Sequence, residues 1–223
     1  MSASNGTRTV TGRRAFLGKL AAGAAASAGA IALSSVALPE TLFASEAPDP
    51  EHWLDSLKGK HKQVVDAYAP NDGFPLAFAH TFLATQGPKE TAGAVVVLRH
   101  FAMPIALNDT AWARYKIGES LKIIDPATKK PAVKNPFYKP ASGVLLVDDM
   151  AVDRLLARGV LLGACSVALA VLSGMLAGNA GVSAEKAKEE WTAAVFPGIT
   201  LLPSGVWGVN RAQEKGCTYV AGG

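Results

Sequence analysis

The sequence predicts an α/β protein in which helices cover both faces of a mainly parallel five-stranded sheet, a three-layer doubly wound domain. Short apolar runs alternate along the chain with segments of helical periodicity, which is the order that such folds require. The runs are short and mostly apolar rather than apolar at every second residue, as expected for strands that are buried on both faces. Five runs meet this description, at about 61–67, 94–99, 160–164, 199–202 and 217–221.

The first half of the chain is expected to hold two of these strands and three helices. The helical segments are 48–59, 74–86 and 108–121. The second of them should stop at Gly87-Pro88, and the third begins with Asn108 and Asp109, two residue types that cap helices. The segment "APNDG" at 69–73 predicts a turn after the first strand.

The second half begins with a long connection and then returns to regular structure. Residues 122–142 contain four prolines, five lysines and little periodicity, which predicts an exposed loop that is either functional or a solvated insertion. The helix expected at 166–179 is apolar on nearly every side, so a second subunit or an unusually thick core should cover it. We therefore expect a homo-oligomer. The other helices of this half are expected at 148–159, 183–195 and 204–216.

The first 47 residues have the pattern of an export signal. Arg13 and Arg14 precede a Phe-Leu pair, and a mildly apolar run rich in alanine and glycine follows at 20–38. This pattern resembles a twin-arginine signal peptide, and small residues favour cleavage after Ala37 or Ala47. The alternative is a retained membrane anchor, because the apolar run is just long enough to span a bilayer.

The composition is that of an ordinary globular protein, 49% hydrophobic and 18% charged. The formal net charge is +4, but without the first 47 residues the chain carries 18 basic and 16 acidic side chains. This balance provides no electrostatic footprint for nucleic acid. We expect one periplasmic domain at 48–223 that contacts a membrane only through an uncleaved signal, and no nucleic-acid partner.

The candidate site lies where the strands end. In a parallel sheet, ligands bind in the crevice outside the carboxyl ends of the strands. The structural alternatives are that the polar residues there cap helices and that the tryptophans pack in the core. The residues that follow the first four strands are Asp72, then Arg99, His100, Asn108, Asp109 and Trp112, then Cys165, and finally Ser204 and Trp207.

Cys165 carries the clearest chemistry among these residues. It lies where a predicted strand ends and a helix begins, so unpaired backbone N–H groups and the helix dipole favour its thiolate form. His100, at the end of the neighbouring strand, is placed to accept the thiol proton. The alternatives are a buried, inert Cys165 and a His100 with a structural hydrogen bond.

Cys217 is not expected to pair with Cys165. It begins the last strand and therefore lies at the opposite edge of the sheet. A five-residue strand spans roughly 17 Å, whereas a disulfide needs Cα atoms within about 7 Å of each other. Cys165 should therefore be a free thiol.

The signatures of several other site types are missing. The sequence contains no CxxC, glycine-rich phosphate loop, HExxH or GxSxG, and its four histidines are scattered without the spacing of metal ligands. We therefore expect neither a metal nor a cofactor.

Three segments resemble the DsrE/DsrF-like sulfur-relay family, and the resemblance covers roughly residues 60–221. It implies a compact α/β domain with a parallel sheet and assembly into dimers, trimers or hexamers. It also implies a persulfide on the cysteine after the third strand, in a context that "RGV" at 158–160 and Cys165 match. The segments are "LLARGVLLGACSVAL" (155–169), "FPGITLLPSGVWGVNRAQEKGCTYV" (196–220) and "VLRHFAMPIALNDTAWARYKIGE" (97–119), the last being similar to an exported branch.

Two functions are consistent with this pattern. The first is a periplasmic sulfane-sulfur carrier or sulfurtransferase that holds a persulfide on Cys165, with sulfur donor and acceptor proteins as partners. The second is a non-catalytic small-ligand-binding or assembly module, which keeps the fold and uses a pocket near His100, Asn108 and Trp112. In the second case, Cys165 is buried and inert.

Overall fold

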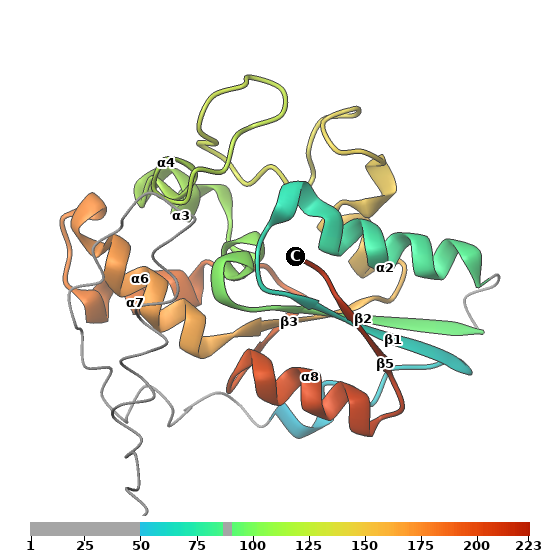
Figure 1. Cartoon of the computed structure of the whole chain (residues 1–223). Coiled ribbons are helices and arrows are strands. Elements are labelled where there is room, and N and C mark those ends of the chain that lie inside the picture. The colour runs from blue at the N-terminus through green and yellow to red at the C-terminus, as the bar shows by residue number, and fades with distance from the viewer. Residues whose placement is uncertain (1–49, 87–90) are drawn as a thin grey trace, which may run out of the picture. The chain divides into compact units, whose positions relative to one another are not determined.

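Five parallel strands form one sheet at the centre of the structure, a computed structural model that describes residues 50–86 and 91–223 (Figure 1). The strands lie in the order β4-β3-β2-β1-β5, which confirms the predicted α/β fold with a mainly parallel sheet. Every residue of β2 is buried, as its continuous apolar run predicts. The strands are β1 (His61–Ala67), β2 (Ala92–Leu98), β3 (Leu161–Cys165), β4 (Ile199–Leu202) and β5 (Thr218–Ala221).

Helices lie on both faces of the sheet, with α2 on one side and α8 on the other (Figure 1). Val96 and Leu98 of β2 join the larger apolar cluster, with side chains from α2, α5 and α6. Val95 and Val97 point the other way, into a smaller cluster that includes α8. The helices are α2 (Phe74–Thr85), α3 (Asp109–Arg114), α4 (Ile117–Ser120), α5 (Val152–Ala157), α6 (Ser166–Ala180), α7 (Ala184–Ala193) and α8 (Gly205–Glu214).

The strand register brings the ends of three neighbouring strands together. Leu98 in β2 pairs with Ala67 in β1 on one side and with Ala164 in β3 on the other. The residues that follow these three therefore reach the same edge of the sheet; they are Arg99, Tyr68 and Cys165.

The prediction of a helix at 48–59 is wrong for the residues that the structure describes. The chain forms a 3₁₀ turn at Pro50–His52 and then further turns closed by hydrogen bonds to the carbonyl three residues back. Trp53 and Leu57 pack in the apolar cluster on the α8 side of the sheet. A helix of this length has little stability of its own, so tertiary packing decides the conformation.

The helix expected at 108–121 is divided into α3 and α4. Lys116, which lies between them, adopts the left-handed conformation with φ of 47°. Gly118 in α4 lies so close to the backbone of Ala132 that a Cβ atom at residue 118 would come within 2.2 Å of the Ala132 carbonyl oxygen. The contact with the loop at 122–142 therefore sets the position of α4.

The loop at 122–142 contains no helix or strand, as predicted, but parts of it are buried. The Asn135 side chain is buried and donates hydrogen bonds of 2.9 and 2.7 Å to two carbonyls in the segment 105–107. Tyr138 stacks on Phe196, with 3.5 Å between the ring centroids. Most of the loop is exposed, as expected, but these contacts attach the part around Asn135 to the body of the domain.

The apolar helix α6 is only partly covered by the described residues. It runs one residue further than predicted and ends at Gly181, which is left-handed with φ of 67°. Leu169 and Leu172 face the core, whereas Met175 is 39% exposed. No single helix in the described ranges has the length and hydropathy to cross a membrane; α6 and α7 pass that criterion only as a pair bent by 109°.

The other expected helices are present, and one of them is divided. The segment 148–159 forms a 3₁₀ turn at Asp148–Met150 followed by α5. The helix α8 starts directly after its predicted cap, Ser204. Ser183, expected inside the first turn, is the N-cap of α7. The predicted export signal at 1–47, with its cleavage positions after Ala37 and Ala47, lies outside the described residues. So does the expected break at Gly87-Pro88.

Candidate functional site

A partly buried ion pair lies at the carboxyl edge of the sheet. Arg99, just after β2, donates from Nε and Nη2 to the two carboxylate oxygens of Asp66 in β1, the second bond being 2.8 Å long. The Asp66 side chain is 6% exposed and that of Arg99 is 29% exposed. Such a two-pronged contact fixes the plane of the guanidinium as well as its position.

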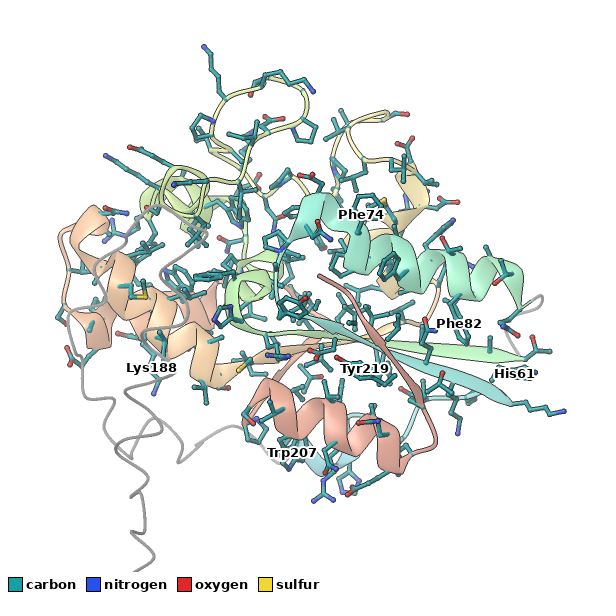
Figure 2. The ribbon with its side chains drawn as sticks, viewed as in Figure 1. His61, Phe74, Phe82, Lys188, Trp207 and Tyr219 are labelled. Atoms are coloured by element: carbon teal, nitrogen blue, oxygen red, sulfur yellow. The ribbon has the colours of Figure 1, made fainter. Side chains whose placement is uncertain are left out.

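Two tyrosines complete the surroundings of this pair. The Tyr219 hydroxyl in β5 donates a 3.0 Å hydrogen bond to Asp66, and the Arg99 guanidinium carbon lies 5.6 Å from the centre of the Tyr68 ring. Figure 2 labels Tyr219 on β5, at the side of the sheet that α8 covers. We refer to these four residues and Cys165 as the carboxyl-edge cluster.

The start of α8 packs directly against Arg99. A Cβ atom at Gly205 would lie 2.4 Å from the Arg99 Cβ, so only glycine allows this approach without a shift. The hydrogen bond to Asp66 raises the pKa of Arg99 above its ordinary value, partial burial opposes this, and the charges of Asp66, Tyr219 and Cys165 add smaller increases. Arg99 is therefore a permanent, positioned cation.

Cys165 occupies the predicted junction between a strand and a helix. It is the last residue of β3 and the N-cap of α6, and its Sγ accepts a 3.3 Å hydrogen bond from the backbone N–H of Ala168. The residue is 6% exposed and belongs to the larger apolar cluster. The thiol therefore has the helix-start contact that was expected, but only a narrow opening to solvent.

Cys217 is a second free and buried thiol, so the two cysteines are not joined, as predicted. It precedes β5, and its neighbour Thr218 pairs with Gln63 near the amino end of β1. Burial raises the pKa of Cys217 to about 11, with Lys62 opposing the shift. Cys217 is therefore protonated at neutral pH.

His100 does not contact the thiol as the sequence suggested. It has no hydrogen bond to Cys165 in the described part of the chain, and its ring lies edge-on to Phe101 with centroids 4.3 Å apart. Partial burial lowers the pKa of His100, Arg99 lowers it further, and a hydrogen bond with the Tyr68 backbone opposes both. The backbone of His100 is left-handed, with φ of 49°, a conformation that few non-glycine residues adopt.

Asn108, Asp109 and Trp112 have structural roles. The Asn108 side chain caps α3 by accepting from the Ala111 N–H, and Asp109 accepts from the backbone N–H of Asn135. Trp112 is fully buried and donates a 2.9 Å hydrogen bond to the Pro104 carbonyl. Within the described part of the chain, none of these three side chains makes a hydrogen bond or ring contact with the carboxyl-edge cluster.

The structure therefore divides the predicted pocket. Asn108 lines a separate cavity of about 430 Å³ beside α7, where Glu190 accepts hydrogen bonds from Arg114 and from the Tyr115 hydroxyl. Asp72 lines another, of about 200 Å³, beside Lys122. Neither cavity is lined by Cys165, Arg99 or His100.

The last two predicted residues belong to α8. Ser204 accepts a 3.2 Å hydrogen bond from the Trp207 N–H and so caps the helix, which places the serine next to the contact between Gly205 and Arg99. Trp207 is half-buried, with the Arg211 guanidinium carbon 5.4 Å from its ring. It packs beside the smaller apolar cluster.

The sequence reasoning missed Asp66, Tyr68 and Tyr219. A signal for the first was present, because Asp66 is the one carboxylate inside the apolar run of β1, and a buried carboxylate needs a partner. The two tyrosines carried no comparable signal. Within the described ranges, no group of three or more His, Cys, Asp or Glu side chains is placed to hold a metal ion.

Comparison with known proteins finds no matching family model, no matching curated protein and no matching solved structure. The functional interpretation therefore depends on the geometry of the carboxyl-edge cluster and on the sequence pattern around Cys165.

Proposed function

We propose that this chain is an exported sulfane-sulfur carrier that holds sulfur as a persulfide on Cys165. The observation that carries the proposal is the position of the thiol, which caps the first turn of α6 at the carboxyl edge of the sheet, one strand away from Arg99. A helix start and a nearby cation both stabilise the negative charge that a thiolate or a terminal persulfide carries. The resemblance to the DsrE/DsrF-like family supports the same residue.

The proposed loading step balances without an added oxidant. The Cys165 thiolate attacks a sulfane sulfur of a polysulfide, and a new bond forms between Sγ and that sulfur. The sulfur–sulfur bond next to the attacked atom breaks, and the shortened polysulfide leaves with the electron pair. Delivery is the reverse process, in which an acceptor thiolate attacks the outer sulfur and Cys165 leaves as thiolate.

The small opening at Cys165 is compatible with this role. With an exposure of 6%, the residue presents only a small surface, which favours compact donors over bulky ones. A buried persulfide is also shielded from reductants, because nucleophilic attack needs access to sulfur. We extend the proposal to a homo-oligomer in the periplasm, since the exposed side of α6 around Met175 suits a second subunit.

The second candidate is a non-catalytic binding or assembly module. The observation that favours it is the membership of Cys165 in the larger apolar cluster, together with the absence of a hydrogen bond to His100 within the described residues. In this case, the thiol behaves as a small apolar side chain.

Intact-mass spectrometry after incubation of the reduced protein with polysulfide tests the carrier proposal. We expect an adduct of one sulfur atom on the wild type and on Cys217→Ser, and none on Cys165→Ser. Cys217→Ser is the matched control because it removes the thiol that is protonated at neutral pH. An unloaded wild type, or an equally loaded Cys165→Ser variant, would contradict the proposal and favour the module.

A further inference from the structure

Arg99 is held more firmly than a surface arginine needs to be. Two of its nitrogen atoms are bound to Asp66, and its guanidinium lies over the Tyr68 ring. Its Cβ is in close contact with Gly205 at the start of α8. Asp66 is in turn held by Tyr219. The side chain therefore keeps one orientation, which lowers the entropy that binding a ligand would cost.

The remaining nitrogen of this guanidinium is free. Nε and Nη2 face Asp66, whereas Nη1 has no hydrogen-bond acceptor among the residues of 50–86 and 91–223. Nη1 is accessible to solvent, because it is not among the buried polar atoms without a hydrogen-bond partner. The Arg99 side chain as a whole is 29% exposed. The Asp66 side chain is 6% exposed, so Arg99 is the partner of the pair that is more accessible to solvent.

The residue that carries this free donor and the residue that carries the thiol end neighbouring strands. Leu98 and Ala164 are paired across β2 and β3, and Arg99 and Cys165 are the next residues of the two strands. Cys165 is also one of the groups whose charge raises the pKa of Arg99, so the two side chains lie within range of an electrostatic interaction. An anion that binds Nη1 is therefore held in the neighbourhood of Cys165.

We infer that Arg99 orients a small oxyanion that carries a sulfane sulfur, with thiosulfate as the simplest example, for attack by Cys165. This inference depends on the proposed carrier function and adds the class of donor. Arg99 binds the sulfonate oxygens, and the Cys165 thiolate attacks the outer sulfur. The bond between Sγ and that sulfur forms, the sulfur–sulfur bond of thiosulfate breaks, and sulfite leaves with the electron pair. Total charge is conserved, and the cation offsets the repulsion between two anions.

Alkylation of Cys165 by an anionic and a neutral reagent of similar size tests the cation without requiring sulfur transfer. The measured quantity is the ratio of the iodoacetate rate to the iodoacetamide rate at Cys165, followed by peptide mass mapping. We expect the ratio to be higher in folded protein than in urea-unfolded protein, and to fall roughly tenfold in Arg99→Gln, as the loss of one nearby charge implies. Lys188→Gln, with the same charge change on α7, should leave the ratio unchanged.

Folding of the variants does not limit this test. Arg99→Gln leaves Asp66 without its partner, so Asp66→Asn/Arg99→Gln serves as a second variant that removes both charges. The comparison of folded and unfolded wild type needs no variant at all. Equal ratios in folded and unfolded wild type, or a ratio that both Arg99 variants leave unchanged, would overturn the role of Arg99.

Loading with thiosulfate separates this inference from the carrier proposal. We expect thiosulfate to load the wild type and to load the Arg99 variants at least tenfold more slowly, while polysulfide loading falls less. Equal thiosulfate loading of wild type and Arg99→Gln would refute the inference and leave the carrier intact. A cation-dependent alkylation ratio with no loading by either donor would refute the carrier and, with it, the proposed donor class.

Discussion

The replacement of Asp66 by asparagine should destabilise the protein more than any exposed carboxylate substitution. Asn keeps the size of the side chain but removes its charge and one of its two acceptor oxygens. Asp66 accepts from Arg99 Nε, from Arg99 Nη2 at 2.8 Å and from the Tyr219 hydroxyl at 3.0 Å, so part of this set is lost. Arg99 then keeps its charge without an opposing carboxylate.

The size of the effect follows from the burial of the two partners. Breaking a fully buried ion pair costs about 3–5 kcal/mol. Because the Arg99 side chain is 29% exposed, its stranded charge is partly hydrated, and we reduce the expected loss to about 2–3 kcal/mol. For a domain of this size, that loss lowers the Tm by about 5–10 °C.

Urea unfolding monitored by tryptophan fluorescence measures this loss. We expect a lower midpoint with an unchanged slope for Asp66→Asn, a loss of about 1 kcal/mol or less for Tyr219→Phe, and almost none for the control Asp149→Asn. Asp149 is exposed and makes no hydrogen bond with another described residue. If Asp66→Asn and Asp149→Asn unfold within about 0.5 kcal/mol of each other, the ion pair does not stabilise the sheet edge as we argue.

Three further results are expected. In a urea titration, Gly118→Ala should lose several kcal/mol of unfolding free energy, because its Cβ would lie 2.2 Å from the Ala132 backbone. The control Gly178→Ala, whose Cβ would have no atom within 4 Å, should be neutral or gain up to about 1 kcal/mol. Equal unfolding free energies for the two variants would contradict the close contact at Gly118. His100→Asn should lose less stability than the wild type as pH falls from 7 to 5. The folded pKa of His100 is lowered, so the unfolded chain binds the extra proton and stability is lost as pH falls through the unfolded value of about 6.5. If the unfolding midpoints of the wild type and the variant change with pH in parallel, this expectation is refuted. Met175→Lys should shift the protein to a smaller species in light scattering, and a wild type that is already monomeric would reject the oligomer.

The fold was predictable because it depends on periodicity. Short, mostly apolar runs indicated β1 to β5, and a serine cap located the start of α8. The prediction failed where long-range contacts override local preference. The turns after Pro50 depend on packing against the sheet, and the break at Lys116 accompanies the contact of Gly118 with the loop.

The candidate site was only half visible in the sequence. Cys165 and Arg99 were identified because each follows a strand, and that position is readable from the apolar pattern alone. Asn108 and Trp112 follow a strand as well, yet they serve α3 and the core. The number of residues after a strand does not determine where the chain runs next. Residues that follow the same strand can therefore lie in different parts of the structure once the chain turns.

The order of apolar and polar residues was enough to predict the parallel sheet, most of the helices around it and the separation of the two thiols. It was enough because burial on both faces leaves a local pattern in each strand. Which side chains meet at the sheet edge was decided only by the tertiary structure. Asp66, Arg99 and Tyr219 are far apart in the chain, and the strand order β2-β1-β5 alone makes them neighbours.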